Sequence, residues 1–518
     1  MRSGELVFRP YFVQKGIGPH LESVVLTGDE ENNVFCSDIH LAKEGVKISD
    51  IRGRKKFSIM LRWNVEGFGF LYLSADNGGH LYSLPNRGTR QLNLNYELLS
   101  SRSARNLRRL SSFLLHGWKP SSDLQIFLDL SMEYLLSAHH QYRHPEVCAQ
   151  LAQRGLGYAL WAGELMEIEF AKFAIRKTGY RRDFFFGCDA RGYFQIKKNL
   201  FLDRFKELFN YATVTHYLIG DVYNFEPREN QKNYAERDKV IKALLQSGIT
   251  VEGRPLFWTH KWVTPDWLRR KSYTRLLKYL EKHVRQVVAH YQDKITVWEA
   301  VNELHDWANE LELSPQQTIE VTRLICNTAR DTDPKIKLLI NNCCPFAEYI
   351  QAGRWGWRKA RYPQRTPQQF ITDLIAHEVD FDIIGVQVYF VKRTIADMIE
   401  NIERYRNFGK EIHLAEIGAP SRGTTQEFDS KDTTDFSTIP YEWIRHWDEE
   451  LQADWLEYIF TLAYSRPYIG AANWYDFVDP YGYLKSGGLL RSPQGEKKAA
   501  FYRLHKIQKN WRLLKRTK

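Results

Sequence analysis

From about residue 181 onward, short apolar runs alternate with stretches in which apolar residues recur every three or four positions. This spacing predicts amphipathic helices, over 235–248, 273–291, 315–329, 366–378 and 395–409. The intervening runs are rich in β-branched and aromatic residues, as buried strands are. Eight such runs are present, at 184–190, 208–214, 250–258, 295–303, 335–342, 381–390, 411–418 and 468–477.

Eight strands with helices between them predict an α/β fold, the (β/α)8 TIM barrel, over 179–518. A doubly wound open sheet is the alternative. That architecture would usually carry a Gly-rich phosphate-binding turn after an early strand, and the sequence has none there. The barrel is therefore the favoured architecture.

The chain before the barrel divides into two parts. The first 95 residues are strand-rich, because 56–84 contains two or three short strand patterns broken by the turn sequence "DNGG". Residues 96–178 form a connecting region with helical spacing over 106–118, 124–142 and 146–177. The aromatics of "FGFLYLSADNGGHLY" recur with period two. They indicate either a carbohydrate-binding module or the core of that module and its contact with the barrel.

Composition adds a preference for aromatic contacts. Aromatic residues make up 14% of the chain and include 15 Trp, which suits either the stacking of flat, weakly polar ligands such as sugars or the filling of large cores. The net charge of +11 invites a nucleic-acid interpretation, but 491–518 alone carries ten Lys or Arg against one acid. This tail reads as a final helix with Phe501, Leu504 and Ile507 on its apolar face, together with Trp511. We expect its basic face to be merely solvated and separable from catalysis.

The remaining sequence signals concern compartment and cofactors. Six cysteines show no CxxC pair, so neither metal ligation nor a disulfide framework is expected, and no cofactor is implied. Residues 1–16 lack the apolar segment of a signal peptide, and no run of 18 apolar residues occurs. We expect no membrane span, and a cytoplasmic location unless the chain is exported by another route.

Polar residues gather at the ends of the predicted strands, where barrel enzymes place their chemistry. The fourth strand ends in Asn302 and Glu303, and the seventh carries Glu416 inside an apolar run. Two carboxyl groups facing each other across a barrel mouth can hydrolyse a glycosidic bond, one as acid and one as nucleophile or base. The alternative is that each glutamate is simply ion-paired at a strand end. Other polar or aromatic residues at strand ends are Trp258 and His260 on the third strand, Gln387 and Tyr389 on the sixth, and Trp474 on the eighth.

Strand alternation raises one difficulty. Successive side chains of a strand point to opposite faces, so Asn302 and Glu303 can line one pocket only if the pleat breaks at the end of the strand.

Five segments resemble motifs of the xylanase-type family 10 glycoside hydrolases. "ITVWEAVNE" resembles the family's W-D-V-V-N-E, "IHLAEIG" its I-H-[IV]-T-E, "VEGRPLFW" its R-G-H-x-L-V-W, and "DIIGVQVYF" its D-x-I-G-x-Q-x-H. The ending "GGLLRSPQGEKKAAFYRL" is similar to the family's closing stretch. The resemblance follows the family's order across about 184–504, and so concerns the barrel alone.

The resemblance implies a retaining endo-β-1,4-xylanase-type hydrolase acting on a polysaccharide or oligosaccharide. Glu303 would be the general acid/base and Glu416 the nucleophile, about 5–5.5 Å apart. Asn302 would bind the 2-hydroxyl of the sugar, Gln387 would hold the nucleophile side of the site, and Trp474 would form a sugar platform.

The sequence departs from the family where the sugar is gripped. The family's E-N-x-M-K is replaced by a stretch with His216 and Tyr217 in place of Glu-Asn. Its W-H-S-Q becomes the longer "WTHKWVTPDW", in which His260 takes the histidine's place only loosely. Tyr389 replaces the histidine of Q-x-H, and its hydroxyl can also hydrogen-bond a carboxylate. These changes keep the two carboxyl groups that would cleave the bond, but they leave the identity of the substrate undetermined. Two hypotheses compete with hydrolysis. One is a non-hydrolytic polysaccharide-binding protein. The other is a nucleic-acid-associated protein, which only the basic tail supports.

Overall fold

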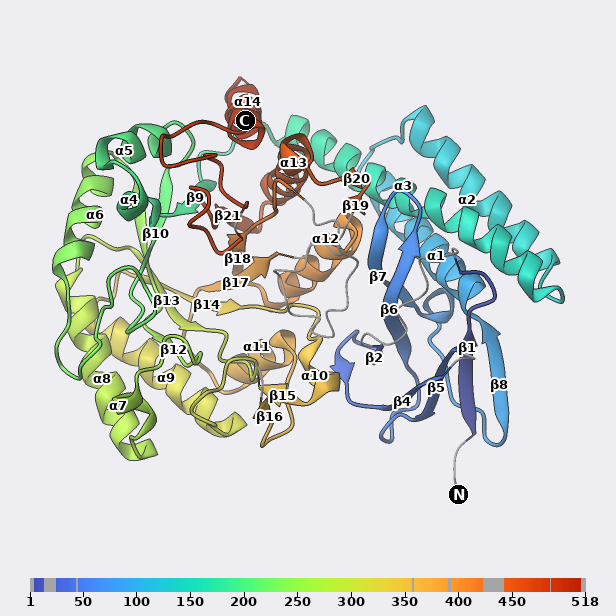
Figure 1. Ribbon diagram of the computed structural model, residues 1–518, viewed down its shortest axis with the longest axis horizontal. Helices are drawn as coiled ribbons and strands as arrows, with labels where there is room; N and C mark the ends of the chain where they lie inside the picture. The colour runs from blue at the N-terminus through green and yellow to red at the C-terminus, as the bar shows by residue number, and fades with distance from the viewer. Residues whose placement is uncertain are drawn as a thin grey trace.

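The computed structural model describes residues 4–13, 25–42, 45–355, 358–389, 393–422, 442–484 and 486–513, and it confirms the barrel (Figure 1). All eight predicted strands are present; Phe390, which ends the sixth, lies outside the described residues. The strands are β9 (Phe185–Asp189), β10 (Tyr211–Thr215), β11 (Thr250–Arg254) continued by β12 (Phe257–Trp258), β13 (Val297–Asn302), β14 (Lys337–Asn342), β17 (Ile383–Val388), β18 (Glu411–Ile417) and β21 (Ile469–Trp474).

The strands form one closed ring of parallel neighbours. The order is β11-β10-β9-β21-β18-β17-β14-β13-β12, and both β11 and β12 pair with β13, which closes the barrel. The third strand is split because Pro255 has no N–H to donate, and the next residue, Leu256, donates its N–H to the carbonyl of Glu299. The carboxyl ends of all eight strands therefore open at the same face.

A helix follows each strand and covers the outside of the barrel (Figure 1). These helices are α5 (Lys198–Lys206), α6 (Ala235–Gln246), α8 (Tyr273–His290), α9 (Pro315–Thr332), α11 (Pro367–Ala376), α12 (Ile395–Arg404), α13 (Glu449–Ser465) and α14 (Ala499–Arg512). Shorter elements lie in the loops: α4 (Gly192–Gln195), α7 (Asp266–Arg269), α10 (Tyr349–Ala352), η2 (Tyr405–Phe408), and the hairpins β15 (Arg354–Trp355) with β16 (Arg358–Lys359) and β19 (Glu442–Trp443) with β20 (Arg445–His446).

The terminal helix α14 is part of the barrel, contrary to our expectation that the tail is separable. Its predicted apolar face is buried in the main core. Trp511 stacks on Tyr464 of α13 with ring centroids 4.2 Å apart, and Gln508 donates to the carbonyl of Leu208. Removing this helix would expose the core of the barrel.

Two four-stranded sheets precede the barrel. One has the order β4-β5-β1-β8 and the other β3-β2-β6-β7. Their strands are β1 (Glu5–Arg9), β2 (Leu26–Gly28), β3 (Val34–Phe35), β4 (Asp38–Ala42), β5 (Gly45–Asp50), β6 (Ser58–Val65), β7 (Gly69–Ala75) and β8 (Thr89–Asn93). "DNGG" follows β7 and forms the 3-10 turn η1 (Asn77–Gly79). Three long helices follow, α1 (Leu94–Leu114), α2 (Ser122–His140) and α3 (Pro145–Thr178). Helices α1 and α3 pack on these sheets, α2 packs on α1 and α3, and α3 also packs on α13.

The period-two aromatics near β7 are core residues. Phe68, Phe70, Tyr72 and Tyr82 are all buried. Tyr72 also receives the guanidinium of Arg393 over its ring at 4.7 Å, from the segment between β17 and α12. Of the two interpretations of this segment, the structure supports the core and docking one. Its aromatics offer no exposed stacking face for a sugar.

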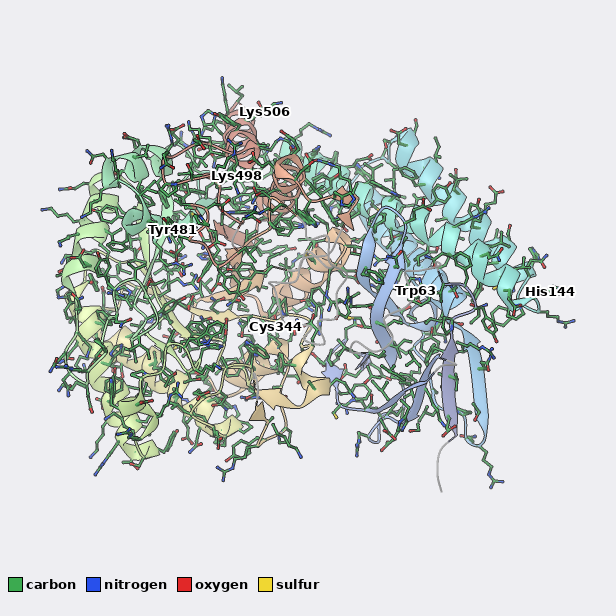
Figure 2. The ribbon with its side chains drawn as sticks, in the orientation of Figure 1. Trp63, His144, Cys344, Tyr481, Lys498 and Lys506 are labelled. Atoms are coloured by element: carbon green, nitrogen blue, oxygen red, sulfur yellow. The ribbon has the colours of Figure 1, made fainter. Side chains whose placement is uncertain are left out.

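Buried and partly buried ion pairs join the helical region to the barrel. Arg102 of α1 donates to Asp397 of α12 at 2.6 Å, and Arg109 pairs with Glu403 at 2.5 Å. Figure 2 labels Trp63 of β6, whose indole N–H donates to Gln153 of α3 at 2.9 Å. The sheets, the long helices and one side of the barrel are therefore in direct contact. Among the described residues, no helix combines the length and apolarity that crossing a membrane requires.

Candidate active site

The pleat of β13 breaks where Asn302 and Glu303 require it. The pairing of β13 with β14 shifts register between Glu299 and Val301, and Glu303 adopts a left-handed backbone conformation with φ of 53°. A positive φ is uncommon outside glycine and ends the regular alternation of side chains. As a result, the Nε2 of Gln387 lies 3.4 Å from Asn302 Oδ1 and 2.9 Å from Glu303 Oε1.

The same amide of Gln387 links the two predicted catalytic carboxyl groups. Its Nε2 donates to Glu303 Oε1 at 2.9 Å and lies 3.2 Å from Glu416 Oε1. These two oxygens therefore cannot be farther apart than the two contacts laid end to end. So short a distance between these two oxygens favours the ~5–5.5 Å between the carboxyl groups of retaining glycosidases over the ~6.5–9.5 Å of inverting ones.

Hydrogen-bond donors surround the carboxylate of Glu416. Arg254 forms an ion pair with Oε1, and Asn341 Nδ2 donates to the same oxygen at 3.0 Å. The hydroxyl of Tyr389 donates to Oε2 at 2.9 Å, as the histidine-to-tyrosine replacement predicted. A carboxylate that accepts this many charged and neutral hydrogen bonds is fixed in orientation.

A second acid, Glu299, lies next to this pair. Its Oε2 is 3.6 Å from Arg254 Nε and accepts from Asn341 Nδ2 at 3.0 Å. Burial raises the pKa of Glu299 well above its usual value, against the lowering effect of Arg254. Glu299 therefore favours its neutral form more than an exposed glutamate does, and Arg254 makes the closer of its two ion pairs with Glu416.

Glu303 is in a different electrostatic environment from Glu416. Burial, and then the negative charge of Glu416, raise the pKa of Glu303 to about 7, against the lowering effects of Gln387, Trp258 and Arg254. At neutral pH this carboxyl is shared between its protonated and ionised forms. A carboxyl with a raised pKa beside a carboxylate that is paired with an arginine is the arrangement that acid/base catalysis with a nucleophile needs.

Aromatic side chains line the site around these acids. Trp258 pairs in register with Asn302, and its ring lies 5.2 Å from that of Tyr217. The hydroxyls of Tyr217 and Tyr475 are 3.5 Å apart, and the guanidinium of Arg254 lies 5.4 Å from the centre of the Tyr475 ring. No catalytic or binding role was predicted for Tyr217, Arg254, Asn341 or Tyr475. Strand alternation is the signal that would have identified two of them. Tyr217 lies two positions after Thr215 and four after Thr213, and Arg254 lies two after Glu252, so each shares a face with the residues before it.

Two predicted sugar-contacting residues are not at the site. His216 is buried in the layer outside the strands, where its ring packs against Phe225, Tyr291 and Trp298, because alternation turns it away from the barrel interior. Trp474 is fully buried, and its indole N–H donates to the carbonyl of Gly487 at 2.9 Å. Neither ring has a face to offer a sugar.

Six of the other seven predicted residues come together. Glu303, Glu416, Asn302 and Gln387 are joined by hydrogen bonds, with Tyr389 on Glu416. Trp258 lies beside them. His260 is farther out, half-buried and stacked on Trp258 with ring centroids 5.1 Å apart.

Known proteins resemble this chain across the barrel. "Endo-1,4-beta-xylanase B" of Thermotoga neapolitana is 25% identical over 305 residues, which are 57% of this chain and 75% of that protein. "Endo-1,4-beta-xylanase A" of Caldicellulosiruptor saccharolyticus is 22% identical over 304 residues, 54% of this chain and 82% of that protein. Among solved structures, native xylanase 10B from Thermotoga maritima matches with a TM-score of 0.47 and 17% identity, covering 66% of this chain and 98% of that one.

The sequence profile of glycosyl hydrolase family 10 matches residues 203–507. This span runs from α5 to α14 and includes both carboxyl groups joined by Gln387. Because this profile matches more than half of the chain, the chain belongs to glycosyl hydrolase family 10.

Proposed function

We propose that this glycoside hydrolase cleaves β-1,4-linked xylan, or oligosaccharides derived from it, with retention of configuration. The single observation that carries the mechanism is the amide of Gln387, which links Glu416, enclosed by donors, to Glu303, whose pKa burial raises to about 7. The names of the relatives support xylan as the substrate. The remaining polar residues of the site support cleavage of the substrate rather than binding alone.

In the first half-reaction, the carboxylate of Glu416 attacks the anomeric carbon and forms a glycosyl ester. The glycosidic bond breaks, and Glu303 gives its proton to the departing oxygen. In the second half-reaction, Glu303 takes a proton from water, the water oxygen attacks the same carbon, and the ester bond returns its electrons to Glu416. The two inversions together retain the configuration.

The neighbouring side chains orient these groups. Asn302, whose carboxamide lies beside Gln387, binds the 2-hydroxyl of the sugar, a contact that strengthens as charge develops in the transition state. Tyr389 and Asn341 fix the nucleophile. Tyr217, Tyr475 and Trp258 provide aromatic contacts in place of the family's Glu-Asn pair. A purely sugar-binding protein would have no need of Glu416 enclosed by donors or of the raised pKa of Glu303.

The substrate assignment is tested by incubating the wild type with plant polysaccharides and their oligomers, followed by reducing-sugar assay and product masses. We expect short pentose oligomers from xylan. Hexose products would keep the mechanism and overturn the substrate. The Glu416→Ala variant, run in parallel, is the control for contaminating enzymes, because their products would appear with both proteins. Absence of products on every substrate would overturn the proposed function.

Arg254 is expected to sustain turnover through its ion pair with the nucleophile. Replacing it with methionine removes the cation that pairs with Glu416 and leaves this buried carboxylate without its charged partner. We expect kcat to fall about 100-fold, the scale for losing one preorganised electrostatic partner. Arg254→Lys keeps the charge and should restore much of the rate. Equal losses of rate in both variants would contradict an electrostatic role.

A further inference from the structure

A series of aromatic rings in contact leads outward from the cleavage centre, with one stacked, one tilted and one edge-on pair. Tyr217 and Trp258 have ring centroids 5.2 Å apart, Trp258 and His260 5.1 Å, and His260 and Trp262 4.7 Å. The series begins beside Asn302, since Trp258 pairs with it in register. It ends in the lengthened loop after β12, the segment "WTHKWVTPDW" that departs from the family pattern.

Burial falls steadily along this series. Tyr217 is 7% exposed, Trp258 and His260 are half-buried, and Trp262 is 58% exposed. Burial, with a smaller effect of Lys261, lowers the pKa of His260 to about 4, so its ring is neutral at ordinary pH. The rings therefore form an uncharged aromatic track from the interior of the site to the surface.

Hydrogen bonds within the loop hold the exposed tryptophan in place. The backbone N–H of Trp262 donates to His260 Nδ1 at 3.3 Å, and the carbonyl of His260 accepts from the N–H groups of Val263 and Thr264. Arg269 donates to the carbonyls of Lys261 at 2.6 Å and Thr264 at 3.0 Å. A turn with this many internal bonds fixes the backbone from which the indole of Trp262 projects.

Neighbouring loops support the same turn. Arg269 forms an ion pair with Glu310, in the loop after β13, at 2.9 Å. Gly220, in the loop after β10, packs directly on this backbone: a Cβ there would lie 2.5 Å from the carbonyl oxygen of Trp262. The turn is therefore fixed by the loops on both sides of it, although its most prominent side chain faces solvent.

We propose that Trp262 is a sugar-stacking platform for a residue of the substrate chain beyond the sugars at the cleavage centre. An exposed indole on a rigid support binds a partner without first losing conformational freedom. The apolar face of a β-linked sugar fits such a surface. Continuity with Trp258 and Asn302 points to the polysaccharide itself as the occupant. The inference rests on the proposed function and adds to it a preference for longer chains.

The test compares Trp262→Ala with the wild type on xylohexaose and on an aryl xyloside carrying one sugar. We expect KM for xylohexaose to rise about tenfold, the factor for losing roughly 60 Å² of apolar contact, with kcat unchanged. KM for the aryl xyloside should stay the same. Tyr502→Ala is the matched control, because Tyr502 is 60% exposed on α14, in the outer helix layer.

Calorimetry separates this inference from the proposed function. Xylohexaose is titrated into the inactive Glu416→Ala variant with and without Trp262→Ala. Weaker binding only in the double variant supports the platform. Unchanged binding, or a KM that rises equally for both substrates, overturns it while leaving the xylanase assignment intact. A wild type that neither cleaves nor binds xylohexaose overturns the proposed function and, with it, the platform.

Discussion

Replacing Glu416 with alanine is expected to lower turnover by at least about 10⁴-fold, the scale seen when a nucleophile is removed from a catalytic group. Without this carboxylate no glycosyl ester can form. The vacated space lies beside Arg254, Asn341 and Tyr389. Added azide should enter it, drawn by the guanidinium, and attack an activated aryl β-glycoside. The expected product is the α-glycosyl azide, identified by NMR, because a single displacement inverts the anomeric centre.

The variant should remain folded, which makes the loss of activity interpretable. Losing Glu416 leaves Arg254 next to Glu299, whose Oε2 is 3.6 Å from Arg254 Nε and which can ionise in its place. Glu411→Gln is the matched control. It lies at the other end of the same strand, paired with Lys337. Wild-type rates in Glu416→Ala would contradict the assignment of the nucleophile, as would a β-glycosyl azide product.

Periodicity was sufficient to predict the barrel, because all eight strands are continuous apolar runs bounded by turns. It could not predict how strand ends depart from regular geometry. Asn302 and Glu303 share a pocket only through the register shift and the positive φ at Glu303, which depend on pairing with β14 rather than on local sequence. The prediction that the pleat must break was correct; its form required the structure.

The site residues that the sequence missed are those whose importance lies in contacts across the barrel. Arg254 is an unremarkable arginine in "VEGRPLFW" until the closed ring brings it against Glu416 from four strands away. The errors have the same origin. His216 and Trp474 have suitable chemistry at suitable positions along the chain, but the orientation of one strand and the packing beneath another turned both into core residues.

Glu303 is expected to control the upper pH limit of activity. It must be protonated to assist the leaving group, and burial raises its pKa to about 7, so kcat/KM of the free enzyme should fall as pH rises through about 7. Glu303→Gln keeps a side chain of the same size beside Gln387 but has no proton to transfer. We expect it to slow cleavage of xylan 10²- to 10⁴-fold and to abolish the upper limb.

Leaving-group dependence distinguishes loss of the acid from general damage to the site. An aryl glycoside with a strongly acidic phenol needs no protonation, so Glu303→Gln should still release that phenol in a rapid burst, while the following hydrolysis stays slow because the water has lost its base. Glu312→Gln, an exchange in the loop that follows Glu303, should leave both the limb and the burst unchanged. If the upper limb persisted in Glu303→Gln, the group that titrates there would be a different acid. Glu299, another carboxyl of this site whose pKa burial raises, would be the next to replace.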